Sequence, residues 1–214
     1  MKPLKFFSLV VGLFLLAGHA WAITPCGTSG MTVVKADSGG RYVVYAFREG
    51  PDVAFQVPGT DMSFPNGTTG SKMFTLDGVV FETLFVKTAD FIKPTTGKSD
   101  LEILKEHRDF DVAFIQKAGG ALQKMVELGP RDRPASNGQP AFTFYLWQMI
   151  DPKKPRGASQ YFLTTVTSGE VAVLSAIVPD EAKLDVAMTA FESYASSFQH
   201  ILRKTQCPDP TKKS

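Results

Sequence analysis

The sequence has few of the side chains on which metal sites and redox centres depend. Its 214 residues include two cysteines, Cys26 and Cys207, and three histidines, of which His19 lies near the N-terminus. A structural zinc site takes four Cys or His ligands, and a thioredoxin-like redox centre takes a Cys-x-x-Cys pair, which this sequence lacks. We therefore expect neither a metal site nor a cofactor.

An excess of charge of one sign and long hydrophobic runs are also missing. Apart from Lys2 and Lys5 at the N-terminus, 21 basic and 21 acidic side chains remain. A neutral chain without a basic cluster has little electrostatic attraction for nucleic acid or anionic lipid. Beyond the N-terminus, no segment reaches the roughly 20 apolar residues that cross a bilayer. Nucleic-acid binding and an integral membrane span are both unexpected.

Residues 1–22 resemble a secretory signal peptide. Lys2 and Lys5 form a basic start, residues 6–17 form a mostly apolar run, and Ala20-Trp21-Ala22 matches the small-x-small pattern that signal peptidase cuts. The pattern predicts cleavage after Ala22. The mature protein is accordingly expected in the periplasm, or secreted.

If the protein is exported, the two cysteines are expected to form a structural disulfide. In an oxidising compartment, an even number of cysteines without a close pair is typical of a disulfide, so we predict a bond between Cys26 and Cys207. Bridged Cα atoms lie roughly 4.4 to 6.8 Å apart, and the bond would bring both ends of the mature chain together. Residues 23–207 are predicted to form one domain, followed by a disordered tail at 208–214.

The strongest structural pattern lies in residues 161–203. Residues 161–167 and 171–178 are rich in β-branched and aromatic side chains, and Ser168-Gly169 between them predicts a hairpin turn. After Pro179 the apolar spacing changes from two to 3.6, which predicts one long amphipathic helix reaching Arg203. The apolar stripe of this helix consists of Leu184, Ala187, Met188, Phe191, Tyr194, Ala195, Phe198, Ile201 and Leu202.

The first half of the chain contains weaker strand patterns and a second hairpin. Residues 41–47 and 53–57 are predicted to be extended. Residues 72–76 and 79–87 are predicted to pair as a hairpin, because Asp77-Gly78 suits the positive φ angles of a tight turn.

A capped helix is predicted after this hairpin. Ser99 followed by Glu102 is a capping box, and the helix is expected over residues 101–118. Its predicted apolar face consists of Ile103, His107, Phe110, Phe114 and Ala118. As the one polar member of that face, His107 is expected to be partly buried and hydrogen-bonded, with a catalytic role as the alternative.

The middle of the chain predicts a strand that is buried on both sides. Residues 122–128 favour a strand, with a helix as the alternative, and residues 129–140 a polar loop. In the strand predicted at 141–150, apolar side chains point both ways, so both sheet faces should be covered. With a helix before and after, the predicted fold is α+β: a single-domain antiparallel β-sheet flanked by helices on both faces.

This order of elements resembles that of the PsbP-like and DcrB-like α/β/α sandwich proteins. The shared order is a hairpin, a capped helix, a strand led by Gly138-Gln139-Pro140-Ala141, and then strand, Ser-Gly turn, strand and a final long helix. The resemblance covers residues 72–203. It implies an exported accessory, chaperone or adaptor module, and it transfers no catalytic or binding residue.

The leading functional hypothesis is a non-enzymatic accessory or chaperone-like protein that binds another envelope or secreted protein. One alternative is a periplasmic immunity protein against a toxin. Another is a carrier of a small apolar ligand, held between the sheet and the final helix in a pocket lined by Phe142, Phe144, Leu174 and Phe191. An enzyme would require His107 or His200 to meet a carboxylate and a hydroxyl in a cleft.

Overall fold

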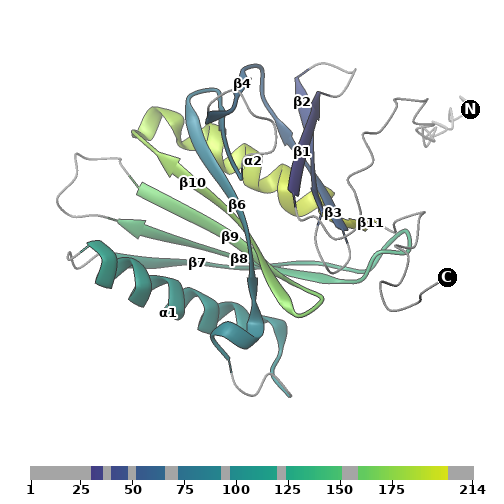
Figure 1. The fold of residues 1–214 in the computed structure, drawn as a ribbon, viewed down its shortest axis with the longest axis vertical. Helices are drawn as coiled ribbons and strands as arrows, with labels where there is room; N and C mark the ends of the chain where they lie inside the picture. The colour runs from purple at the N-terminus through teal and green to yellow at the C-terminus, as the bar shows by residue number, and fades with distance from the viewer. Residues whose placement is uncertain are drawn as a thin grey trace, which may run out of the picture.

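The computed structural model describes residues 30–35, 40–47, 52–65, 72–92, 97–119, 124–150 and 159–201. Within these ranges the chain forms a large sheet, a small sheet and two α-helices (Figure 1). The seven-stranded sheet has the order β4 (Met62–Ser63), β5 (Met73–Leu76), β6 (Val79–Lys87), β10 (Glu170–Val178), β9 (Ser159–Thr167), β8 (Phe142–Ile150) and β7 (Lys124–Arg133). The four-stranded sheet has the order β1 (Gly30–Lys35), β2 (Arg41–Phe47), β3 (Asp52–Pro58) and β11 (Gln199–Ile201).

The two helices cover opposite faces of the seven-stranded sheet. Helix α1 (Asp100–Gly119) and helix α2 (Leu184–Ser197) pack on different sides of it. Strand β8 shows the reason, since its successive side chains enter different cores. Phe142, Phe144 and Leu146 lie in the core shared with α2, whereas Tyr145, Trp147 and Met149 lie in the core shared with α1. The predicted antiparallel sheet between two helices is confirmed.

Both predicted hairpins are present, and their turns explain the pairing. Asp77 and Gly78 have φ angles of 47° and 86°, and Ser168 and Gly169 have φ angles of 46° and 81°. Positive φ at both central positions is the geometry of a tight turn that matches strand twist. The first turn places β5 beside β6, and the second places β9 beside β10.

The small sheet was not predicted, and it adds a layer on the far side of α2. Val44, Phe55 and Val57 of this sheet share one core with α2. The rings of Phe55 and Tyr194 lie 4.6 Å apart, centroid to centroid. Helix α2 is therefore enclosed between two sheets, which explains why Ala187 and Ala190, its small residues, are completely buried.

The final helix is shorter than the sequence predicts. Helix α2 ends at Ser197, Phe198 turns to φ −57° and ψ 128°, and the chain continues as strand β11, in which His200 pairs with Val53. A helix reaching Arg203 was therefore wrong. The apolar spacing continues through Phe198 and Ile201, so periodicity alone could not reveal that the chain changes to a strand.

Residues 129–133 belong to strand β7 and not to a polar loop. Arg131, Asp132 and Arg133 pair with β8, and the register shifts between Glu127 and Gly129. Gly129 has a φ angle of 98°. Glycine and proline favoured a loop at this position, but an edge strand tolerates both, because a bulge and a missing N–H disturb no second neighbour.

Several predicted features lie outside the described residues. They are the signal peptide at 1–22, both cysteines of the predicted disulfide and the tail at 208–214.

Candidate functional site

Helix α1 begins where the sequence predicts, at a reciprocal cap. The Glu102 carboxylate accepts hydrogen bonds from the Ser99 backbone N–H and from its hydroxyl, both at 2.7 Å. These bonds hold the pKa of Glu102 below its usual value. The cap fixes the N-terminal end of α1 and therefore which side chains meet the sheet.

Only the first half of α1 is buried on the face that the sequence predicts. Ile103, Leu104 and His107 are buried, whereas Phe110 is 42% exposed and Phe114 is 66% exposed. Phe114 follows His107 by seven residues, so both side chains lie on one face of the helix. The predicted residues do lie on one face of the helix. Beyond His107, however, the two phenylalanines of that face are exposed to solvent and not buried.

A residue from the segment that follows β6 packs over part of this face of α1. The ring of Phe91 lies 5.2 Å from the His107 ring and 5.8 Å from the Phe110 ring. Among the described residues, no ring contact reaches Phe114. We call Phe91, Phe110 and Phe114 the aromatic flank of α1. On α1, the flank extends the line of buried side chains at Ile103 and His107 toward the exposed half of the helix.

His107 lies beneath this flank and differs from its predicted state. Its side chain is fully buried, not partly buried, and neither ring nitrogen has a hydrogen-bond partner among the described residues. The nearest polar atom is Oδ2 of Asp111, 3.5 Å from Nδ1. Burial lowers the pKa of His107 to about 4 and raises the pKa of Asp111 to about 7.

A charged cluster fixes the opposite side of α1. The Arg108 guanidinium donates to the Tyr145 hydroxyl, lies 2.7 Å from the Asp109 carboxylate and lies 3.3 Å from the Glu127 carboxylate. Burial raises the pKa of Tyr145 to about 12, so its hydroxyl stays protonated at neutral pH. The cluster joins α1 to β7 and β8 and leaves the aromatic flank on the other side of the helix.

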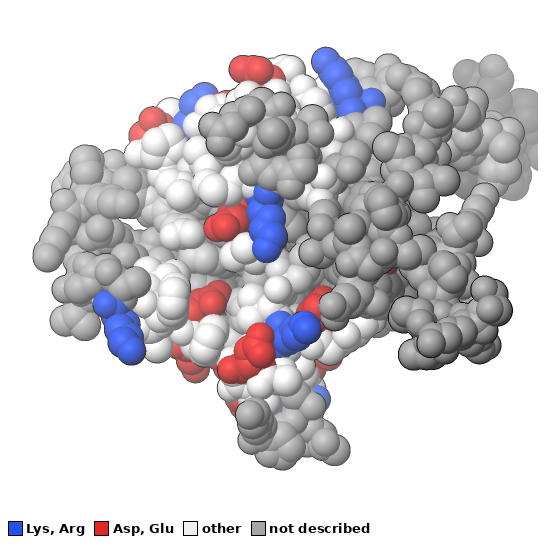
Figure 2. Space-filling view, viewed as in Figure 1, with Lys and Arg blue, Asp and Glu red and all other residues white. Residues whose placement is uncertain are grey.

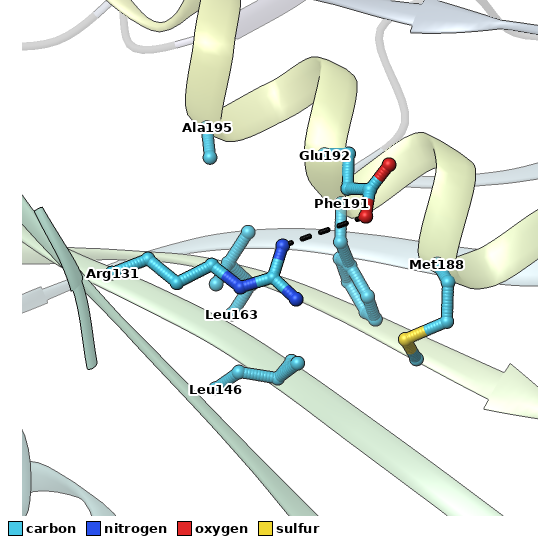
Figure 3. A pocket seen from close by; sticks show the side chains of 7 residues that line it. All are labelled: Arg131, Leu146, Leu163, Met188, Phe191, Glu192 and Ala195. Carbon is cyan, nitrogen blue, oxygen red and sulfur yellow. Dashed lines mark ion pairs between the residues drawn. The ribbon is translucent and has the colours of Figure 1, made fainter. Parts of the chain in front are cut away.

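The four residues of the predicted ligand pocket lie in the core between the seven-stranded sheet and α2. Phe142, Phe144, Leu174 and Phe191 are all buried in one packed core. A hollow beside Phe191 has a cavity volume of about 10 Å³, which is room for about one water molecule. Figure 3 shows Arg131 reaching across this hollow toward Glu192, with 3.6 Å between the charged atoms.

A polar clamp at the end of α2 was missed by sequence reasoning. Arg133 Nη1 donates to the carbonyl oxygens of Ala195 and Ser196, each at 3.0 Å, and Nη2 donates to the carbonyl of Phe198. A cation at a helix C-terminus binds carbonyl groups that have no partner within the helix. Because Arg133 is 62 residues from Ala195 in the chain, no local pattern could have revealed this cap.

His200 extends the clamp and joins the two sheets. Its backbone N–H donates to Gln139 Oε1 at 2.8 Å, and its carbonyl accepts from Gln139 Nε2 at 3.1 Å. Its Nε2 lies 2.6 Å from the Thr167 hydroxyl at the end of β9. His200 therefore meets a hydroxyl and His107 meets a carboxylate, but these contacts lie in buried or packed surroundings and the two histidines are on different elements.

Two further features of the described residues are the grouping of their metal-binding side chains and the spread of their charge. No group of three or more metal-binding side chains comes together among the described residues. Figure 2 shows acidic and basic side chains interspersed among uncharged ones on one face of the molecule. No helix in the described ranges is long and apolar enough to cross a bilayer.

Comparisons with known proteins bear on the fold. No protein-family model matches the chain, and no curated protein matches it by sequence. The solution structure of cyanobacterial PsbP (CyanoP) from Synechocystis sp. PCC 6803 is similar, with 11% identity and a TM-score of 0.44, over 86% of this chain and 99% of that one.

Proposed function

We propose that this chain is an exported accessory protein without catalytic activity that binds another protein through the aromatic flank of α1. The observation that carries the proposal is the exposure of two neighbouring phenylalanines, Phe110 at 42% and Phe114 at 66%, on the continuation of a core stripe. A contiguous exposed apolar surface of this kind is typical of a protein interaction site.

The surroundings of the flank suit a protein partner better than a small ligand. Aromatic side chains supply much of the energy of protein interfaces when a partner excludes water from them. The flank projects from a helix that is fixed by the Ser99 cap and by the Arg108 cluster. A partner segment with aliphatic or aromatic side chains would therefore meet a surface that is already ordered.

Export and an oxidising compartment belong to the same proposal. The basic and apolar N-terminus supports export, and the predicted bond between Cys26 and Cys207 would suit an extracytoplasmic protein. The partner is then expected among envelope or secreted proteins.

Affinity capture from the envelope of the source organism tests this function. The wild-type chain should retain one or more proteins that a Phe110→Ser/Phe114→Ser double variant does not retain. Serine and phenylalanine have similar helix propensities, so the substitution removes the aromatic surface and leaves α1 intact.

Leu128→Ser provides the matched control. Leu128 is 46% exposed on edge strand β7, so this change also removes an exposed apolar side chain. The control should retain the same partner, and binding should be reproduced with the purified partner. Capture that is equally strong with the double variant, or no capture by the wild type, would contradict the proposal.

A further inference from the structure

The state of His107 calls for a physical explanation. The ring lies fully buried, with both nitrogens unpartnered among the described residues. Buried polar groups in folded proteins nearly always have a hydrogen-bond partner. Asp111 stands one helical turn further on, with Oδ2 3.5 Å from Nδ1 and its side chain 23% exposed. This separation is slightly beyond a normal hydrogen bond.

We propose that His107 and Asp111 share a single proton: the protonated Asp111 carboxyl donates a hydrogen bond to Nδ1 of a neutral His107 imidazole. The pair then carries no net charge, and the buried imidazole gains an acceptor role at one nitrogen. Because the pair lies on the helix that carries the aromatic flank, its consequence for binding rests on the proposed function. The protonation state itself does not.

The shifts of both groups agree with this arrangement. Burial lowers the pKa of His107 from 6.5 to about 4 and raises that of Asp111 from 3.8 to about 7. In the unfolded chain at about pH 5 the proton would therefore lie on the imidazole, and in the folded chain on the carboxyl. Folding transfers the proton within the pair without taking up or releasing one.

Three basic groups on or next to α1 have acidic partners of their own. Lys98 pairs with Glu106, and Lys105 lies 3.7 Å from Glu127. Arg108 also contacts Glu127, on the side of α1 that faces β7. Among the described residues, no ion pair joins any of these groups to His107 or Asp111.

The elements packed against α1 bring few other titratable groups. Strand β8 contributes Tyr145, whose hydroxyl accepts from Arg108. Strands β9 and β10 contribute Phe162 and Val173 to the shared core. Asp90, next to Phe91, is exposed. Asp111 is thus the carboxyl placed to exchange a proton with His107.

A prediction follows for the pH dependence of stability. The number of bound protons sets the slope of stability against pH. Between about pH 4 and 6.5 the pair holds one proton in both the folded and unfolded states, so it contributes no slope. Each residue alone would contribute a slope, and the two slopes have opposite signs.

The signs follow from the directions of the shifts. If His107 is present without Asp111, the contribution of His107 to folding stability is complete above its unfolded pKa of 6.5 and is lost as the pH falls toward 4. If Asp111 is present without His107, the contribution of Asp111 to folding stability is complete below its unfolded pKa of 3.8 and is lost as the pH rises toward 7. In the wild type the two opposite pH dependences cancel. The packing of α1, which carries the aromatic flank, should therefore be insensitive to the external pH over this range.

Urea unfolding of the full chain at several pH values tests the pair. Relative to wild type between about pH 4.5 and 6.5, the unfolding equilibrium constant of Asp111→Asn should fall with rising pH, by up to tenfold per pH unit. That of His107→Gln should rise by up to the same factor. Asp109→Asn is the control, because it makes the same substitution at an exposed carboxyl on the same helix, and its slope should follow that of wild type.

Two outcomes would overturn the inference. One is a slope for Asp111→Asn that equals the wild-type slope, and the other is slopes of the same sign for both variants. Carboxyl NMR of the wild type then shows which group holds the proton, because Asp111 should titrate near pH 7 in the proposed pair and a midpoint near 4 would refute it. These readouts need no partner, so loss of the proposed binding function would leave them unchanged.

Discussion

The two helices of this protein have opposite relations to their surroundings. Helix α2 is enclosed between two sheets, and its C-terminal carbonyl groups are bound by Arg133. Helix α1 packs on one sheet face only, its second half carries exposed phenylalanines, and its core contains buried nitrogens of His107 and Trp147 that lack partners among the described residues. Packing against both sheets and the bonds from Arg133 tie α2 into the fold. The second half of α1 instead leaves two aromatic side chains open to solvent.

The largest expected effect comes from breaking the enclosure of α2. Phe191→Ala removes a ring that is 2% exposed and lies 6.3 Å from the Phe81 ring. Truncating a buried phenylalanine costs about 3 to 5 kcal/mol, since the cavity left behind closes only partly. Chemical denaturation should show this loss. A loss below about 1 kcal/mol would mean that α2 is less well packed than the structure shows.

An intermediate effect is expected from removing the polar clamp that Arg133 forms at the end of α2. Arg133→Gln should lower the free energy of unfolding by about 1.5 to 3 kcal/mol, because hydrogen bonds from a charged group to the helix carbonyls are lost. Arg131→Gln is the matched control: its partner Glu192 is exposed and their ion pair is open to solvent. Such pairs contribute about 0 to 1 kcal/mol. Equal losses for the two arginines would contradict the capping role.

Local sequence patterns predicted the elements that depend on neighbouring residues. The alternating apolar side chains of β8, the Asp77-Gly78 turn and the Ser99 cap each act within a few residues, and each is confirmed. Strand β11 was missed because it is three residues long and its pairing with β3 joins residues 147 apart, as His200 and Val53 show. Pairing over that distance leaves no periodic trace in the sequence.

The candidate site was only half predictable for a similar reason. Periodicity placed His107, Phe110 and Phe114 on one face of α1, which is right, but periodicity cannot say what covers that face. Among the described residues, the ring of Phe91, from a segment after β6, contacts the rings of His107 and Phe110 and no ring of α1 beyond them. Asp111 could have been found, since a histidine and an acid four residues apart on a helix lie side by side.

The smallest expected effect on stability comes from the residue with the largest proposed effect on binding. Phe114→Ser should change the free energy of unfolding by no more than about 0.5 kcal/mol, the usual range for surface substitutions, because its ring is 66% exposed. The same variant should lose most of its affinity for the captured partner. Denaturation and binding measured on one preparation separate the two properties. A large loss of stability would show that Phe114 belongs to the core, and α1 would then resemble α2 more closely than its exposed half indicates.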